Sequence, residues 1–166
     1  RNEMLLGREA VERLAASPGC VGGLGGVGSY AVEALARSGV GELTLIDQDA
    51  YGESNINRQL GALESTLGLP KAEVLARRVL DINPDCCVHP IVGRYTREER
   101  EQYFGDYDYI ADAIDLVSCK VDLICQAIER NIPILSALGT GNKLDPSRIQ
   151  VTDLSKTQGC PLARVM

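Results

Sequence analysis

A glycine-rich segment limits the possible folds of this chain more than any other feature. Residues 20–29 read Cys-Val-Gly-Gly-Leu-Gly-Gly-Val-Gly-Ser, and Gly23, Gly25 and Gly28 match the pattern G-x-G-x-x-G. Glycine allows a tight turn and lets backbone N–H groups approach a ligand that a side chain would keep away. The pattern predicts a strand, a turn and a helix whose N-terminus faces an anion.

The flanking segments extend this unit to strand, helix and strand. Residues 29–38 have a helix-forming composition, and Gly39 follows where a left-handed residue commonly ends a helix. The apolar residues Leu43, Leu45 and Ile46 predict a strand that ends at Asp47. Asp47 lies about 20 residues after the last glycine, where dinucleotide-binding folds place a carboxylate on a ribose hydroxyl. The strand before the loop is weakly marked, because residues 17–20 contain proline and glycine and Val21 is nearly alone.

The remaining sequence continues the alternation of strands and helices. We expect a helix over 70–82, a strand over 88–92, a short helix after Thr96 and Glu99, a strand over 107–113, a helix over 117–131 and a strand over 132–137. This order predicts one α/β domain over residues 1–166, with a Rossmann-like, doubly wound, mostly parallel twisted sheet and helices on both faces. Ligands of such sheets bind at the carboxyl ends of the strands, where Asp47, Asp115 and Gly139 fall.

Composition agrees with an ordinary enzyme domain. The chain has 166 residues, of which 45% are hydrophobic, and it contains no Trp. No apolar stretch approaches the ~18 residues of a membrane span, and we expect no membrane partner. The six cysteines have no repeating spacing, so we expect reduced thiols and a cytoplasmic protein. The formal net charge of -6 does not favour nucleic-acid binding by this segment alone.

Two cationic residues downstream of Asp47 indicate that the ligand is ATP rather than a dinucleotide cofactor. Arg58 and Lys71 follow the acidic Asp49. In a dinucleotide, the glycine turn provides most of the contacts to the bridging pyrophosphate. ATP needs further cations, which balance the charge of its β- and γ-phosphates and the charge that develops during phosphoryl or adenylyl transfer. Neutral hydrogen-bonding residues accompany them: Asn55, Asn57 and Gln59. The segment therefore favours a triphosphate over NAD.

These motifs resemble the adenylating enzymes that activate ubiquitin-like and sulfur-carrier proteins, including those of molybdopterin and thiamine synthesis. Within that superfamily the chain is most similar to the tRNA threonylcarbamoyladenosine dehydratases. The matching segments are Arg1 with Leu5-Leu6-Gly7, the glycine loop, Asp47-x-Asp49, Ser54-Asn55-x-x-Arg58-Gln59, Lys71, Ile82-Asn83-Pro84, Asp112-Ala113-Ile114-Asp115, Asp145-Pro146 and residues 149–157. Members of this branch continue well beyond the position of Met166, so we expect a C-terminal part of the family to be absent here.

The resemblance implies a set of site residues. The nucleotide-binding residues are Gly23, Gly25, Gly26, Gly28, Asp47, Asp49, Asn55, Asn57, Arg58, Gln59, Lys71 and Asp115. Among them, Asp47 would bind the ribose, Asn55 and Arg58 the triphosphate, Lys71 the α- to γ-phosphates, and Asp115 a magnesium ion. The catalytic residues would be Arg58, Lys71, Asp115 and Arg1. In a homodimer, Arg1 of one subunit would reach the ATP of its partner. Leu116 departs from the family, because relatives usually have Asn or Ser there.

The resemblance also implies the activity: adenylation of a carboxylate by ATP and Mg²⁺. The leading hypothesis is that the carboxylate belongs to threonylcarbamoyladenosine in tRNA, where it cyclises with loss of water. One alternative is adenylation of the C-terminal glycine of a ubiquitin-like or sulfur-carrier protein, although the zinc-binding C-x-x-C pairs of several such enzymes are absent. Another is a nucleotide-dependent binding module or sulfur-relay partner without turnover.

Four further features have both a functional and a structural interpretation. Lys120 either contacts phosphate or pairs with Asp115 on the surface. Cys160 is the best candidate for a reactive thiol, whereas Cys119 and Cys125 are expected in the core. The single histidine, His89, is expected in an edge strand without a catalytic role. Residues 139–142 either line the pocket of the acceptor substrate or form an ordinary turn.

Overall fold

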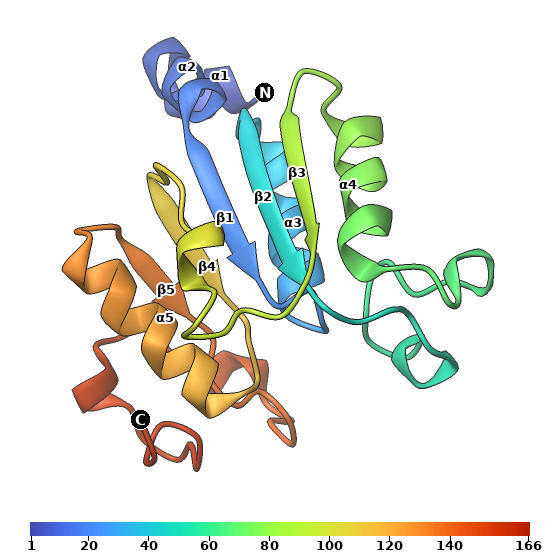
Figure 1. The fold of residues 1–166 in the computed structure, drawn as a ribbon. Coiled ribbons are helices and arrows are strands. Elements are labelled where there is room, and N and C mark those ends of the chain that lie inside the picture. Colours follow the sequence, from blue (N-terminus) through green and yellow to red (C-terminus); the bar gives the residue numbers. More distant parts are fainter.

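The computed structural model describes residues 1–166 and contains a five-stranded parallel sheet in the order β3-β2-β1-β4-β5 (Figure 1). The strands are β1 (Pro18–Gly22), β2 (Glu42–Asp47), β3 (Cys87–Val92), β4 (Tyr109–Asp112) and β5 (Ile134–Ser136). The α-helices are α1 (Asn2–Leu6), α2 (Arg8–Ala16), α3 (Gly28–Ser38), α4 (Lys71–Ile82) and α5 (Val117–Glu129). The chain order reverses between β1 and β4, which is where doubly wound sheets bind ligands.

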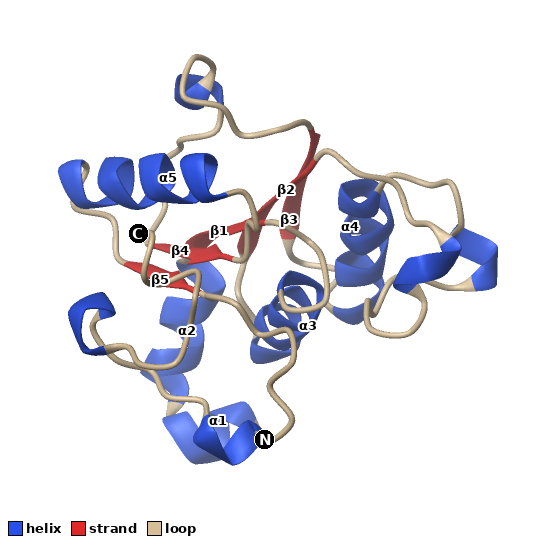
Figure 2. Cartoon of the chain, turned by 90° about the horizontal axis from the view of Figure 1, so that it is seen from below, coloured by secondary structure: helices blue, strands red, loops and turns tan.

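Helices cover both faces of the sheet, with α3 on one side and α5 on the other (Figure 2). The larger apolar cluster joins Val21 and Leu43 of the sheet to Leu75 and Val79 of α4. A second cluster includes Ile110 of β4 and residues of α5, together with Tyr95 and Tyr103 from the β3–β4 connection. The predicted fold class is confirmed.

The predicted elements agree closely with the observed ones. Helix α3 ends at Ser38, and Gly39 has φ 90°, as expected for a left-handed C-terminal residue. Helix α4 buries one apolar face, at Ala72, Leu75 and Val79. Strands β4 and β5 are shorter than the predicted 107–113 and 132–137. One reason is that Tyr107 already belongs to a turn, its N–H donating to the Gly105 carbonyl.

The weakly marked first strand forms in the middle of the sheet. Strand β1 pairs with β2 on one side and with β4 on the other, so its main-chain groups are satisfied by both neighbours. Pro18 is its first residue, where the missing N–H is tolerated. Gly22 lies so close to β4's following loop that a Cβ there would be 3.3 Å from Ile114 Cδ1. Tertiary pairing therefore outweighs the low strand propensity of this segment.

The N-terminal helices α1 and α2 lie near the ends where β1 and β2 begin (Figure 1). Asn2 Nδ2 donates to the Arg37 carbonyl at 3.3 Å, which attaches this arm to the C-terminal end of α3. No helix of the structure combines the length and apolar character that crossing a membrane requires.

Candidate nucleotide-binding site

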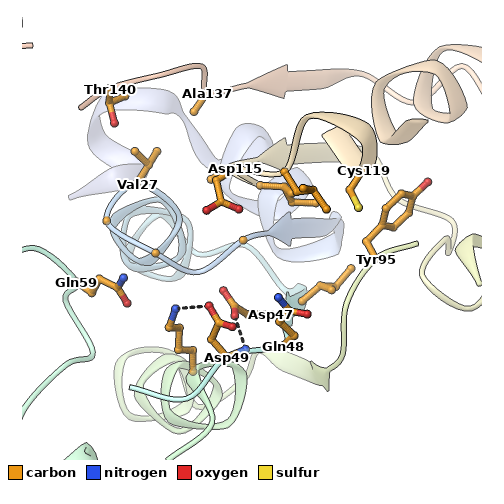
Figure 3. A pocket seen from close by; sticks show the side chains of 18 of the residues that line it. Val27, Asp47, Gln48, Asp49, Gln59, Tyr95, Asp115, Cys119, Ala137 and Thr140 are labelled. Carbon is orange, nitrogen blue, oxygen red and sulfur yellow. Dashed lines mark hydrogen bonds and ion pairs between the residues drawn. The ribbon is translucent and has the colours of Figure 1, made fainter. Parts of the chain in front are cut away.

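A cavity of about 670 Å³ opens at the carboxyl ends of the strands and is lined by residues at or just after the ends of all five strands. Ten of the predicted site residues line it: Gly23, Gly25, Gly26, Asp47, Asp49, Asn55, Arg58, Gln59, Lys71 and Asp115. The side chains of Asp47 and Asp115 point toward one another from opposite sides of this space (Figure 3). The fold thus collects in one cavity residues that lie more than 90 positions apart in the sequence.

The glycine loop is shaped by two close backbone approaches. Gly23 has φ 80°, and a Cβ there would lie 2.6 Å from the carbonyl oxygen of Ala113. Gly28 begins α3, and a Cβ there would collide with the carbonyl oxygen of Gly23. Gly28 itself does not line the cavity. Its contact with the nucleotide stays a prediction, and its position in the structure allows α3 to pack closely against the loop.

Asp47 ends β2 and holds the glycine loop. Its Oδ2 accepts a hydrogen bond from the Leu24 N–H at 2.7 Å, and its Oδ1 accepts one from the Asp49 N–H at 2.8 Å. A carboxylate has further acceptor capacity on both oxygens, so these bonds leave room for a ribose hydroxyl. The residue therefore joins the turn after β1 to the loop after β2.

Lys71 places a buried positive charge on the wall of the cavity. The residue is 5% exposed, and its Nζ lies 3.0 Å from Asp49 Oδ2, while Asp49 itself is exposed. A buried ammonium group is costly without a partner of opposite charge. The Asp49 carboxylate is accessible to solvent. An anion that enters the cavity can therefore pair with the Lys71 ammonium group, either beside this carboxylate or in its place.

Arg58 is the second cation of the cavity, and its orientation depends on its neighbours. Its Nη1 donates to the Ser54 carbonyl at 2.8 Å and to Asn57 Oδ1 at 2.9 Å. Asn57 does not line the cavity, and its Oδ1 helps to hold the Arg58 guanidinium; its nucleotide contact stays a prediction. Gln59 is 6% exposed and its Oε1 has no hydrogen-bond partner, which leaves a buried polar group at the cavity wall.

Asp115 supplies a carboxylate from the loop after β4 and has no hydrogen bond or ion pair within the chain. No group of three or more His, Cys, Asp or Glu side chains is arranged to hold a metal ion. Mg²⁺ in nucleotide sites is commonly held by one or two carboxylates together with phosphate oxygens and waters. The single carboxylate of Asp115 fits that mode of binding.

Lys120 differs from both of the predicted alternatives. Its side chain is 0% exposed, and its Nζ lies 2.6 Å from Asp112 Oδ2 rather than beside Asp115. Neither Lys120 nor Asp112 lines the cavity. The expectation of a phosphate contact or of a surface pair with Asp115 was therefore wrong, because the helix turns this lysine inward toward the end of β4.

One part of the cavity wall was missed by the sequence analysis. Gly93, Arg94 and Tyr95, after β3, line the cavity, as does Cys119 in α5. Cys119 is also a core residue, as predicted, with 8% exposure. The same prediction for Cys125 was wrong: this residue is exposed, because residues six apart on an α-helix do not share a face. The position of residues 93–95 at the end of a parallel strand could have indicated their role. Of the predicted segment 139–142, residues 139–141 line the cavity and Asn142 does not.

Three other candidate residues lie outside this cavity. Arg1 is exposed on the N-terminal arm and does not line it. His89 is in the edge strand β3, as expected, with its Nε2 3.2 Å from Glu42 Oε1. Cys160 lies beside Gly139, and a backbone hydrogen bond from Ala163, with smaller contributions from Gly139 and Leu162, lowers the pKa of its thiol.

Comparison with known proteins agrees with this geometry. The chain is 48% identical over 168 residues to the tRNA threonylcarbamoyladenosine dehydratase of Bacillus subtilis, covering 100% of this chain and 66% of the relative. It is 33% identical over 125 residues to the molybdopterin-synthase adenylyltransferase of Haemophilus influenzae, covering 75% of this chain and 51% of the relative.

A solved structure of the E. coli tRNA N6-threonylcarbamoyladenosine dehydratase TcdA in complex with ATP has the same fold. The TM-score is 0.96 at 45% identity, and the match covers 99% of this chain and 68% of the other. The chain spans 59% to 66% of the length of the first three curated relatives. The family described as the ThiF family matches residues 1–164. The chain therefore belongs to the ThiF family.

Proposed function

We propose that this chain is the ATP-binding domain of an enzyme that adenylates the carboxylate of threonylcarbamoyladenosine in tRNA. The observation that carries the proposal is the single cavity that joins a glycine loop, two cations and the Asp115 carboxylate. The 48% identity with the Bacillus subtilis dehydratase supports this acceptor over others. We further propose that the enzyme acts in the cytoplasm.

The roles of the residues follow from their positions. Backbone N–H groups of the glycine loop and the N-terminus of α3 face the phosphates, and Asp47 accepts a hydrogen bond from the ribose. Lys71 and Arg58 balance the charge of the triphosphate, with Asn55 and Gln59 as neutral hydrogen-bonding groups. Asp115 would hold Mg²⁺, which when bound neutralises phosphate charge.

The proposed chemistry uses the nucleotide to create a leaving group. A carboxylate oxygen of the acceptor attacks the α-phosphorus, the bond to the β-phosphate breaks, and pyrophosphate leaves. The carbamoyl group of the same nucleoside then attacks the acyl carbon, gives up a proton, and AMP departs with the carboxylate oxygen. Ring closure within one molecule benefits from a high effective concentration, so the enzyme needs no nucleophile of its own.

The test is mass spectrometry of nucleosides from modified tRNA incubated with the protein, Mg²⁺ and ATP, with AMP measured in the same reaction. The proposal predicts that threonylcarbamoyladenosine loses one water and that AMP appears in equal amount. An unchanged nucleoside alongside tight ATP binding would contradict the proposed acceptor.

A sulfur-carrier or ubiquitin-like protein is the second candidate acceptor, favoured by the 33% identity with a molybdopterin-synthase adenylyltransferase. Exchange between pyrophosphate and ATP that requires such a carrier would support this alternative. Tight ATP binding without any AMP release would instead indicate a binding module.

We also propose a homodimer in which Arg1 of one subunit reaches the nucleotide of its partner. The exposed position of Arg1 and the exposed apolar side chains of Met4 and Leu5 on the same arm support this arrangement. Mixing two inactive variants, Arg1→Ala and Lys71→Ala, should then restore part of the turnover, since mixed dimers contain one complete site. No recovery in demonstrably mixed dimers would contradict the arrangement.

A further inference from the structure

Three polar side chains form a cluster at the ends of β4 and β5: the buried Asp112 and Lys120 and the partly buried Ser136. Asp112 Oδ2 accepts hydrogen bonds from Lys120 Nζ at 2.6 Å and from Ser136 Oγ at 2.6 Å. The side chains of Asp112 and Lys120 are both 0% exposed. A buried ion pair adds little net stability, because desolvation of the two charges offsets their attraction. Stability alone is therefore a poor explanation for this cluster.

The cluster is connected to two loops of the nucleotide cavity. Asp112 Oδ1 accepts a hydrogen bond from the Ile114 N–H at 3.0 Å, in the loop that carries Asp115. The main-chain carbonyl of Asp112 accepts one from the Ala137 N–H at 2.7 Å, at the start of the loop after β5. Lys120 anchors the same carboxylate to α5, which begins directly after this first loop. Residues 113–116 and 137–141 both line the cavity.

The opposite wall of the cavity is held by a different carboxylate. Asp47 bonds the N–H groups of Leu24 and Asp49, and Asp49 in turn pairs with Lys71. The hydrogen bonds of the two carboxylates share no residue. The two walls meet in the main chain, where the Ala113 N–H donates to the Gly22 carbonyl at 2.7 Å. The side-chain bonds that hold Leu24 and Asp49 remain when the Asp112 cluster is disturbed.

We propose that Lys120 is a positioning residue: through Asp112 it fixes the loops 113–116 and 137–141 against each other and so sets the position of the Asp115 carboxylate. The catalytic part of this inference rests on the proposed function, whereas the coupling of the two loops does not. Displacement of Asp115 should impair the transfer step more than the binding of ATP, since Lys71, Arg58 and the glycine loop remain ordered.

Hydrogen exchange of the ATP-free protein tests the coupling without any assay of activity. Lys120→Met keeps the length of the side chain and removes the charge, and the exposed Lys156→Met is the matched control. Lys120→Met should speed exchange at the Ile114 and Ala137 amides by about tenfold or more, because local opening becomes easier there, and leave Leu24 unchanged. Equal exchange in both variants would overturn the proposal.

A second experiment compares the Kd for ATP with kcat for AMP release. Lys120→Met should lower kcat on the order of 100-fold, as expected for a misplaced catalytic group, and change the Kd by less than about threefold. Lys120→Arg, which restores the charge, should recover part of the lost kcat. A parallel loss of ATP binding and kcat with no recovery by arginine would mean a merely structural role and would overturn the proposal.

Ser136→Ala decides the question if Lys120→Met does not fold. It removes one hydrogen bond to Asp112 and keeps the ion pair between Asp112 and Lys120. Unchanged exchange at the Ala137 amide in this variant would then overturn the proposal. If the unmodified protein releases no AMP, the proposed function fails, and hydrogen exchange still decides whether Lys120 couples the two loops.

Discussion

At the scale of single residues, the two cations of the cavity are held in different ways. Lys71 is buried beside Asp49, so its ammonium group has a fixed position before any anion enters. Arg58 is exposed and held through Nη1 by the Ser54 carbonyl and the Asn57 amide. The fixed ammonium group of Lys71 and the more adaptable, planar guanidinium of Arg58 suit different parts of a triphosphate.

Replacing Lys71 or Arg58 with alanine should lower AMP release by about 100-fold or more, because each removes a preorganised charge from the transferred phosphates. Circular dichroism should show an intact fold in both variants. Lys143→Ala serves as the control, since Lys143 is exposed and does not line the cavity. Full activity of both cavity variants would remove the ATP assignment.

Cys160 should react as a thiolate at lower pH than an ordinary cysteine. The backbone hydrogen bond from Ala163 is the main cause of its lowered pKa, because it stabilises the charged form. The alkylation rate of Cys160, followed by peptide mass spectrometry against pH, should therefore have its midpoint below the reference pKa of 9.0. Cys160→Ala should keep its turnover, since the proposed route needs no nucleophile; loss of AMP release in a folded variant would favour a covalent step.

At the scale of elements, the turn between β1 and α3 depends on the absence of a side chain at Gly23. Gly23→Ala should destabilise the protein by about 1–3 kcal/mol for its positive φ, with a further cost from the contact with the Ala113 carbonyl. Gly39 has a similar φ of 90°, and an added Cβ there would meet no other atom within 4 Å. Gly39→Ala therefore measures the cost of the positive φ alone. Urea unfolding should give a larger loss for Gly23→Ala; equal losses would contradict the close approach.

The same elements show what local sequence can predict. The helix over 28–38 and the apolar face of α4 follow from composition, periodicity and Gly39, which are local properties. Strand β1 could not be recognised as securely, because it is stabilised by pairing with β2 and β4, segments distant in sequence. The burial of Lys120 was also missed, because its partner Asp112 belongs to another element.

At the scale of the whole molecule, the parallel sheet accounts for most of the site. Motif spacing was enough to predict the residues after β1, β2 and β4 that meet in the cavity. The contribution of Arg94 and Tyr95 was not predictable from a motif, because these residues follow β3 at the sheet edge and reach the cavity through the path of the β3–β4 connection. The order of the strands therefore explains why the residues after β1, β2 and β4 were predicted and why those after β3 were not.

In the proposed reaction, a carboxylate attacks the α-phosphorus of ATP bound in this cavity. The test supplies tRNA whose threonylcarbamoyladenosine carries ¹⁸O at both carboxylate oxygens and follows the label by mass spectrometry. Adenylation should place one ¹⁸O atom in each AMP and none in pyrophosphate, because the attacking oxygen leaves with AMP. Product formation with unlabelled AMP, or with ¹⁸O in inorganic phosphate, would contradict adenylation.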